Sequence, residues 1–98
     1  MEHFHSEFLS DEQLVSLYLK GNKSFLENLY RRYFNKVYRK CYGFTKNHNE
    51  AFDLAQDILL KSFGKLDSFK GTSKFSTWLY AITTNYCIEF LRKTKTLF

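Results

Sequence analysis

A short basic stretch with aromatic edges carries the clearest binding chemistry in this sequence. Residues 67–85 read D-S-F-K-G-T-S-K-F-S-T-W-L-Y-A-I-T-T-N, with Lys70 and Lys74 between Phe69 and Phe75 and no acidic residue among them. Lysines bind phosphates and aromatic rings stack on exposed bases, so this stretch could hold a single strand of nucleic acid. An ordinary turn between two helices has the same composition, and local chemistry leaves that alternative open.

The small residues of the same stretch predict a loop followed by a helix. Gly71 permits a positive φ angle that other residues resist. Ser73 and Ser76 can each cap the helix that follows, because a hydroxyl oxygen there accepts a free first-turn N–H. A basic loop that leads into a helix N-terminus is suited to phosphate groups. Asn85 lies in the interior of that helix, where its amide competes for backbone hydrogen bonds, and this points to a specific role.

Other residue types that could do chemistry are sparse. Cys41 and Cys87 are too few and too far apart in sequence for a metal site or a disulfide framework, so we expect reduced thiols. His3 and His5 could share a metal ion, but no third ligand is near and a frayed terminus is the better interpretation. His48 lies in a polar segment, where a solvent-facing or capping role is favoured over catalysis. With no nucleophile, metal cluster or phosphate-binding glycine loop, we expect no enzymatic activity and no cofactor.

The composition indicates one folded domain. The chain has 98 residues, of which 44% are apolar and 19% aromatic, and this is typical of a globular domain and not of a disordered chain. It contains no proline and four glycines, a scarcity of breakers that favours long helices. No apolar run approaches the roughly 18 residues of a membrane span, and the N-terminus does not resemble a signal peptide. We therefore expect a cytoplasmic protein.

The net charge of +5 is distributed in segments. Residues 21–46 and 69–98 are basic, whereas residues 1–20 and 47–68 are acidic. Basic segments attract polyanions, and an acidic segment suits a basic protein partner. Solvated helix faces would have the same pattern, so charge does not decide between these interpretations.

The hydrophobic spacing predicts an all-α fold, a single bundle of three main helices plus a short N-terminal helix. We expect the short helix over residues 11–20 and the main helices over about 22–46, 50–66 and 76–93. The apolar positions repeat at three- and four-residue steps, which places them on one face of each helix. The predicted buried faces are Leu26, Leu29, Tyr30, Tyr33, Phe34, Val37, Tyr38 and Cys41; then Phe52, Ala55, Leu59, Phe63 and Leu66; then Trp78, Leu79, Ile82, Tyr86 and Phe90.

Capping signals support these boundaries. Ser10 with Gln13 three positions later forms a capping-box pattern and predicts the start of the first helix. Asn22 can cap the second helix, and either Asn47 or Asn49 can cap the third.

Three motifs in order give the chain a family resemblance. G-N-K-S-F begins at Gly21, D-L-A-Q-D-I-L at Asp53 and L-D-S-F-K-G-T-S-K-F-S-T-W-L-Y-A-I-T-T-N at Leu66. In this order and spacing they resemble region 2 of a bacterial sigma factor of the sigma-70 family, in its extracytoplasmic-function (ECF) group. The resemblance covers about residues 11–93, nearly the whole chain. It implies that residues 1–98 are a single region 2 domain that acts in transcription initiation.

The resemblance implies a polymerase-binding surface on the third helix. Members of this family bind the RNA polymerase core through a coiled coil of its β′ subunit. Gln56 and Asp57 match the family's polymerase-binding pair of a glutamine and an acid. Carboxylates there would pair with arginines of the partner and fix its register. The residues expected to bind polymerase are Phe52, Asp53, Gln56, Asp57 and Leu60.

The resemblance also implies that the domain recognises and melts the promoter −10 element. Phe69 and its loop match the family loop that receives a base flipped out of the duplex, and Asn85 matches an asparagine that helps to form the base pocket. An amide can bond a base edge as donor and as acceptor. The residues expected to bind the non-template strand are Phe69, Lys70, Gly71, Thr72, Ser73, Lys74, Phe75, Ser76, Trp78, Asn85, Arg92 and Lys93.

Three departures from the family pattern weaken this expectation. Ala81 stands where many members have an arginine, and Thr83 and Thr84 replace a small–basic pair, so the DNA face of the last helix is less basic than usual. The family also continues into region 4, a helix-turn-helix domain that reads the −35 element, and that domain is absent from this chain. We expect an isolated domain rather than a natural protein without the second half.

Two other functions are compatible with the sequence. A helical protein-interaction module could retain a polymerase- or anti-sigma-binding surface without opening DNA, and an anti-sigma factor is an expected partner in either case. The second is a reader of double-stranded DNA of the helix-turn-helix type. The long loop and the mid-helix position of Asn85 fit that second function poorly.

Overall fold

The computed structural model describes residues 7–94, and within that range the chain is all-α, as predicted. It contains four α-helices and one 3₁₀ turn, without a strand in the described part: α2 (Asp11–Leu19), α3 (Ser24–Thr45), α4 (His48–Phe63), η1 (Leu66–Ser68) and α5 (Phe75–Thr94). His3 and His5 lie outside the described residues. No helix between residues 7 and 94 has the length and apolar character needed to cross a membrane.

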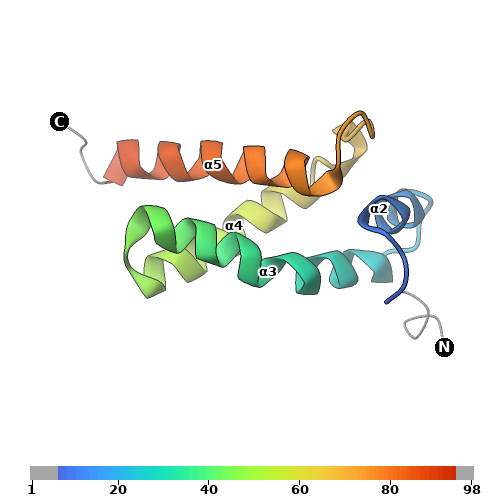
Figure 1. Ribbon diagram of the computed structural model, residues 1–98, viewed down its shortest axis with the longest axis horizontal. Coiled ribbons are helices and arrows are strands. Elements are labelled where there is room, and N and C mark those ends of the chain that lie inside the picture. The colour runs from blue at the N-terminus through green and yellow to red at the C-terminus, as the bar shows by residue number, and fades with distance from the viewer. Residues whose placement is uncertain (1–6, 95–98) are drawn as a thin grey trace.

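The three long helices form the bundle and the short one closes an end of it. α3 and α4 form an antiparallel pair, and α5 lies along α3 and runs in the same direction (Figure 1). α2 packs against the start of α3, beside the loop that leads into α5 (Figure 1). The N-terminal helix and the predicted binding loop are therefore neighbours, although they are far apart in sequence.

The ends of α2 follow local capping rules. The Ser10 hydroxyl oxygen accepts the Gln13 N–H at 3.0 Å and the Gln13 side chain accepts the Ser10 N–H at 2.8 Å, which confirms the predicted capping box. The prediction that Asn22 caps the next helix was wrong. Its side-chain amide donates instead to the carbonyl of Leu17 at 3.4 Å, and Lys23 precedes α3 without a side-chain cap. Asn22 thus satisfies an acceptor at the open end of α2, where helix carbonyls lack intrahelical donors.

The boundaries of α4 differ from the predicted ones. Of the two candidate caps, Asn47 is the cap, and its side-chain oxygen accepts the Glu50 N–H at 2.8 Å. The helix ends at Phe63 and not at about residue 66. The backbone then tightens through Gly64 into the 3₁₀ turn, because glycine gives the helix little support.

The predicted buried face of α4 is confirmed except at Phe52, whereas the buried face of α5 is rotated from the predicted one. On α4, Ala55, Leu59 and Phe63 are buried as predicted, but Phe52 is 46% exposed and its neighbour Ala51 is fully buried. On α5 the fully buried line is Phe75, Leu79, Thr83 and Cys87, whereas Trp78, Ile82, Tyr86 and Phe90 are half-buried. The Thr83 hydroxyl donates to the Leu79 carbonyl at 2.9 Å, so a polar side chain is accommodated in the core at low cost. The predicted buried face of α3 is confirmed, and the residues at its centre are Leu29, Tyr33, Val37 and Cys41.

Candidate functional site

The predicted binding loop, residues 69–74, connects η1 to α5 and exposes its charges. Gly71 has a φ of 75°, which confirms the need for glycine at that position. Lys70 and Lys74 are both exposed, and so are the three small residues between them. The loop therefore presents two cations and its backbone to solvent.

The aromatic residues of the loop are anchors directed into the molecule. The Phe69 ring is half-buried and meets the rings of Phe75 and Trp78, with centroid distances of 5.7 and 5.5 Å. Phe75 is fully buried and also packs edge-on against Tyr33 of α3 at 5.4 Å. Such edge-to-face contacts stabilise the pair beyond simple burial. The rings hold the loop at the bundle, and part of the Phe69 side chain is left accessible.

A side chain of α2 meets the start of α5. The Phe75 N–H, one of the free first-turn donors, bonds to the Glu12 carboxylate at 2.7 Å. The Ser73 hydroxyl donates to the Lys74 carbonyl at 3.4 Å, and Ser76 contacts the Tyr33 hydroxyl from within α5. Neither serine has the predicted capping role at this N–H. Sequence reasoning missed Glu12 because 63 positions separate it from Phe75 and no local motif links them.

Glu12 is positioned because α2 is fastened to α3. Asp11 pairs with Arg32 at 2.9 Å and accepts a hydrogen bond from the Tyr33 hydroxyl, and Arg32 also donates to the Leu9 carbonyl at 2.8 Å. Burial, followed by the hydrogen bond to Asp11, raises the pKa of Tyr33, so its phenol stays protonated and donates. Between α2 and the loop lies a pocket of about 450 Å³ lined by Glu12, Val15, Ser16, Leu19, Lys20, Phe69, Lys70 and Gly71.

Asn85 lies on an exposed part of α5 and faces a different pocket. That pocket, of about 300 Å³, is lined by Lys65, Ile82, Asn85, Tyr86 and Glu89. Phe69 lines the pocket beside α2, and Asn85 lines this second pocket. Arg92 and Lys93 are exposed in the last turn of the same helix.

Two lysines that were not among the predicted DNA-binding residues adjoin Asn85. The ammonium groups of Lys61 and Lys65 lie 5.5 and 5.6 Å from the centre of the Tyr86 ring, and Lys65 also contacts the Tyr86 hydroxyl at 3.5 Å. Cations over an aromatic face are attracted to its π electrons. Lys61 lies in the last turn of α4 and Lys65 lies between α4 and η1, and only the packing of α5 brings both of them to Tyr86.

The five predicted polymerase-binding residues form one exposed face of α4. Phe52 is 46% exposed and Leu60 is 68% exposed, and both are unusual exposures for large apolar side chains. Asp53, Gln56 and Asp57 are also exposed, and Asp57 pairs with Lys61 of the next turn at 3.0 Å. The face is therefore apolar at its two ends and acidic between them.

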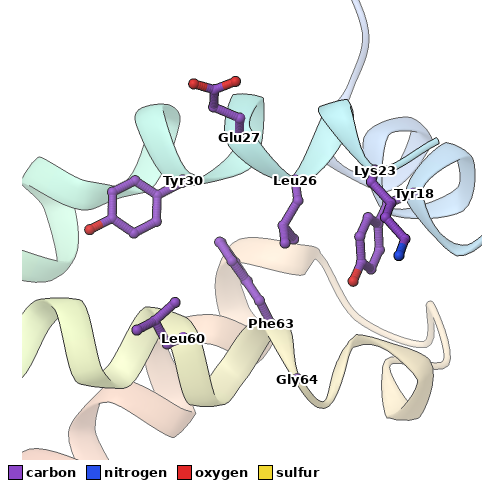
Figure 2. A pocket seen from close by; sticks show the side chains of 8 residues that line it. All are labelled: Tyr18, Lys23, Leu26, Glu27, Tyr30, Leu60, Phe63 and Gly64. Atoms are coloured by element: carbon purple, nitrogen blue, oxygen red, sulfur yellow. The ribbon is translucent and has the colours of Figure 1, made fainter. Parts of the chain in front are cut away.

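An apolar groove adjoins this face near Leu60. The groove lies between α3 and α4, has a volume of about 500 Å³, and is lined by Tyr18, Lys23, Leu26, Glu27, Tyr30, Leu60, Phe63 and Gly64. Leu26 and Phe63 extend toward one another from the two helices, and Glu27 points away from α4 (Figure 2). Sequence reasoning singled out Leu60 but assigned Leu26 and Tyr30 to the core. Both are half-buried at the wall of the groove.

His48 has a structural role. It is the first residue of α4, its Nδ1 atom lies 2.5 Å from the Tyr38 hydroxyl, and its ring stacks on Tyr42 at 4.5 Å. These contacts tie the turn between α3 and α4 together. Within residues 7–94, no three His, Cys, Asp or Glu side chains lie close enough to hold a metal ion.

A match to a protein-family model shows to which family the chain belongs. Residues 29–96 match the model described as Sigma-70 region 2. The chain belongs to the Sigma-70 region 2 family. The matched range contains α4, the loop and α5, which carry every predicted site residue of this sigma region 2 domain.

Relatives of this region 2 domain come from the ECF group. It is 40% identical over 76 residues to the ECF RNA polymerase sigma factor SigW of Bacillus subtilis, an alignment that covers 78% of this chain and 41% of SigW. It is 34% identical over 86 residues to the ECF RNA polymerase sigma-E factor of Haemophilus influenzae, covering 88% of this chain and 45% of that protein. The chain thus spans less than half the length of these relatives.

A solved structure has the same fold. It is the NMR structure of an engineered region 2 of sigmaE in complex with GTAAAA, and it superposes with a TM-score of 0.79 at 34% identity. The match covers 87% of this chain and 88% of that one. The predicted family and fold are both confirmed.

Proposed function

We propose that this domain binds the RNA polymerase core through the outer face of α4 and the promoter −10 element through the loop and α5. The observation that carries the proposal is the position of the two motifs on separate surfaces of a sigma region 2 fold. One surface is exposed, apolar and acidic, and the other is an exposed basic loop. An acidic face suits a basic protein partner, and a basic loop suits the phosphates of DNA.

The solved relative supports the DNA-binding half of the proposal. That protein was determined in complex with GTAAAA, so its region 2 binds a short nucleic acid. In this chain, Lys70 and Lys74 would contact the phosphates of the non-template strand beside the loop. A flipped base costs a few kcal/mol to unstack, and contacts with the protein offset this at about 1–3 kcal/mol per base.

In this proposal the captured strand has two points of contact with the domain. The pocket between α2 and the loop offers the accessible part of Phe69, the backbone at Gly71 and the nearby Lys70 to a flipped base. Asn85 lines its own pocket on α5 and would bond a neighbouring nucleotide. Arg92 and Lys93 extend the cationic track beyond it. The strand would then run from the loop along α5.

The face of α4 supports the polymerase-binding half. An interface needs an apolar centre that excludes water, and Leu60 and the exposed part of Phe52 provide apolar area there. Asp53 and Asp57 would form charge-assisted pairs with arginines of the β′ coiled coil. The groove beside Leu60 lies next to this face and could receive an apolar side chain of the partner.

The proposal predicts that the two activities can be separated by mutation. Asn85→Ala should weaken binding to a single-stranded −10 oligonucleotide about tenfold and leave polymerase binding intact, since one amide–base contact is lost. Gln56→Ala combined with Asp57→Ala should do the reverse. Fluorescence anisotropy measures the affinity for the oligonucleotide, and biolayer interferometry against immobilised polymerase core measures the affinity for polymerase.

Circular dichroism of each variant is the control for folding. Phe69→Ala is a poor probe of DNA binding, because the ring also packs against Phe75 and Trp78. Should both variants lose both activities equally while their helical content is unchanged, the division of labour between the two surfaces would be wrong.

A protein-interaction module that does not open DNA is the second candidate function. Ala81 is exposed where many members have an arginine, and this favours that candidate. Thr83 gives this second candidate no support, because its side chain is fully buried and does not form part of the exposed face of α5. Oligonucleotide affinity that falls steeply with salt supports strand binding by the lysines, whereas a flat salt dependence supports the interaction module.

A further inference from the structure

The two cysteines of the chain meet in the core. Cys41 on α3 and Cys87 on α5 are both fully buried, and their sulfur atoms lie 3.8 Å apart. They are separated by 46 positions in sequence, so only the side-by-side packing of the two helices brings them together (Figure 1). Both cysteines are free thiols, as predicted, but their spacing in sequence did not predict that they meet.

The distance is short enough for a covalent bond after a small movement. A disulfide has a sulfur–sulfur distance of about 2.05 Å, so the two atoms would approach by about 1.8 Å. Helices in packed proteins shift by about 1–2 Å in ordinary conformational changes, and a side-chain rotation supplies part of the movement. The pair can therefore be joined without breaking α3 or α5.

The surroundings make the two sulfurs unequal. The contact with the Cys41 sulfur lowers the pKa of Cys87, burial acts against this, and the Lys40 ammonium group adds to the lowering. The hydrogen bond to Cys87, together with burial, raises the pKa of Cys41. Cys87 is then the better thiolate and the first sulfur to react with an oxidant, and Cys41 is the adjacent thiol that resolves the product.

We propose that Cys41 and Cys87 are a reversible oxidation site, at which a peroxide forms an intramolecular disulfide that joins α3 to α5. The Cys87 thiolate attacks one peroxide oxygen, the O–O bond breaks, and a sulfenic acid and one water result. The Cys41 sulfur then attacks the Cys87 sulfur, forms the S–S bond and releases the second water. The two thiols lose two electrons and the peroxide gains them, and an external dithiol reverses the bond.

Burial determines when this reaction occurs. Because both side chains are inaccessible in the closed bundle, the peroxide reaches them when α5 moves away from α3 locally. Once formed, the disulfide prevents that opening. The consequence is a domain that becomes more stable under oxidising conditions, with its exposed binding surfaces unaltered.

Oxidation of the 98-residue chain with hydrogen peroxide tests the proposal directly. Intact mass spectrometry should show a monomer that has lost two hydrogens, and non-reducing peptide mapping should recover the peptides of Cys41 and Cys87 joined. The thermal midpoint should rise by about 10 °C or more, since the bond closes a long loop in the unfolded chain, and dithiothreitol should reverse the shift.

Two variants and three contrary outcomes sharpen the test. Cys41→Ala and Cys87→Ala should each abolish the loss of two hydrogens and the rise in midpoint, with helical content checked by circular dichroism. The mass measurement on the unmodified chain needs no variant, so a poorly folded variant does not obscure the result. Addition of oxygen atoms without hydrogen loss, or cross-linked dimers only, would overturn the proposal, and so would an unchanged thermal midpoint in the cross-linked monomer.

Discussion

The outer face of α4 and the loop before α5 are both exposed, but they are built in different ways. The α4 face is one side of a regular helix, where Leu60 is 68% exposed and Phe52 is half-exposed with its ring against Phe34 of α3. The loop is held by Phe75, which is fully buried, and by the Glu12 carboxylate from another helix. The residues of the α4 face are exposed because of the side of the helix on which they lie. The loop keeps its position through contacts with residues that are distant in sequence.

This difference determines what mutations can show. Side chains on the α4 face can be changed with little effect on stability, so a loss of binding there reports on the partner directly. Aromatic residues of the loop serve the fold as well, so a loss of nucleic-acid binding after their removal is ambiguous. The cleanest probes of the loop are its lysines, because Lys70 and Lys74 are exposed.

The largest expected effect tests the aromatic anchor of the loop. Phe75→Ala should lower the free energy of unfolding by about 3–5 kcal/mol, because it leaves a cavity beside Phe69, Trp78 and Tyr33. Urea denaturation followed by circular dichroism measures this. Phe8→Ala is the matched control, since the Phe8 side chain is 84% exposed and its removal should change stability by less than about 0.5 kcal/mol. If both substitutions lowered the free energy of unfolding equally, Phe75 would not be an anchor of the loop.

A smaller effect tests the contact from α2. Glu12→Gln should lower the free energy of unfolding by about 1 kcal/mol, because the Phe75 N–H loses its charged acceptor at the start of α5. Glu27→Gln is the control, since Glu27 pairs with Arg31 in an exposed i, i+4 bridge that contributes little. The same denaturation experiment compares them. A Glu12 variant as stable as the Glu27 variant would show that the loop does not need α2.

The smallest effect on stability is expected on the α4 face. Leu60→Ala should change the free energy of unfolding by less than about 0.5 kcal/mol, because the side chain is 68% exposed, and should weaken binding to polymerase core about tenfold. Leu19→Ala, at a 47% exposed leucine of α2, should leave polymerase binding unchanged. Biolayer interferometry with both variants checks this, and a destabilised Leu60 variant would mean that this face belongs to the core.

Much of the fold follows from short-range patterns in the sequence. The capping box at Ser10 and the cap at Asn47 act over three residues, and the structure has both. The positive φ at Gly71 was predicted for the same reason. The exposure of Phe52 was not predicted, because Ala51 and Phe52 are both apolar and periodicity alone does not select between adjacent positions.

The candidate site was predicted in part. The motifs identified the residues of the α4 face and of the loop, and the structure exposes the former as one surface. It places Phe69 and Asn85 on the walls of two different pockets and brings Lys61 and Lys65 to Tyr86, the neighbour of Asn85 in sequence. These outcomes depend on how α5 packs against α4, and no local pattern encodes that packing.

The sequence by itself determined the helices, several of their caps, the charge of each segment and the family to which the chain belongs. These properties arise from interactions between residues three or four positions apart and from motifs of fixed order. Only the tertiary structure decided that Glu12 meets Phe75 and that Cys41 meets Cys87. Contacts between distant residues depend on how helix faces pack, and that packing is set by the whole core together and not by any one stretch.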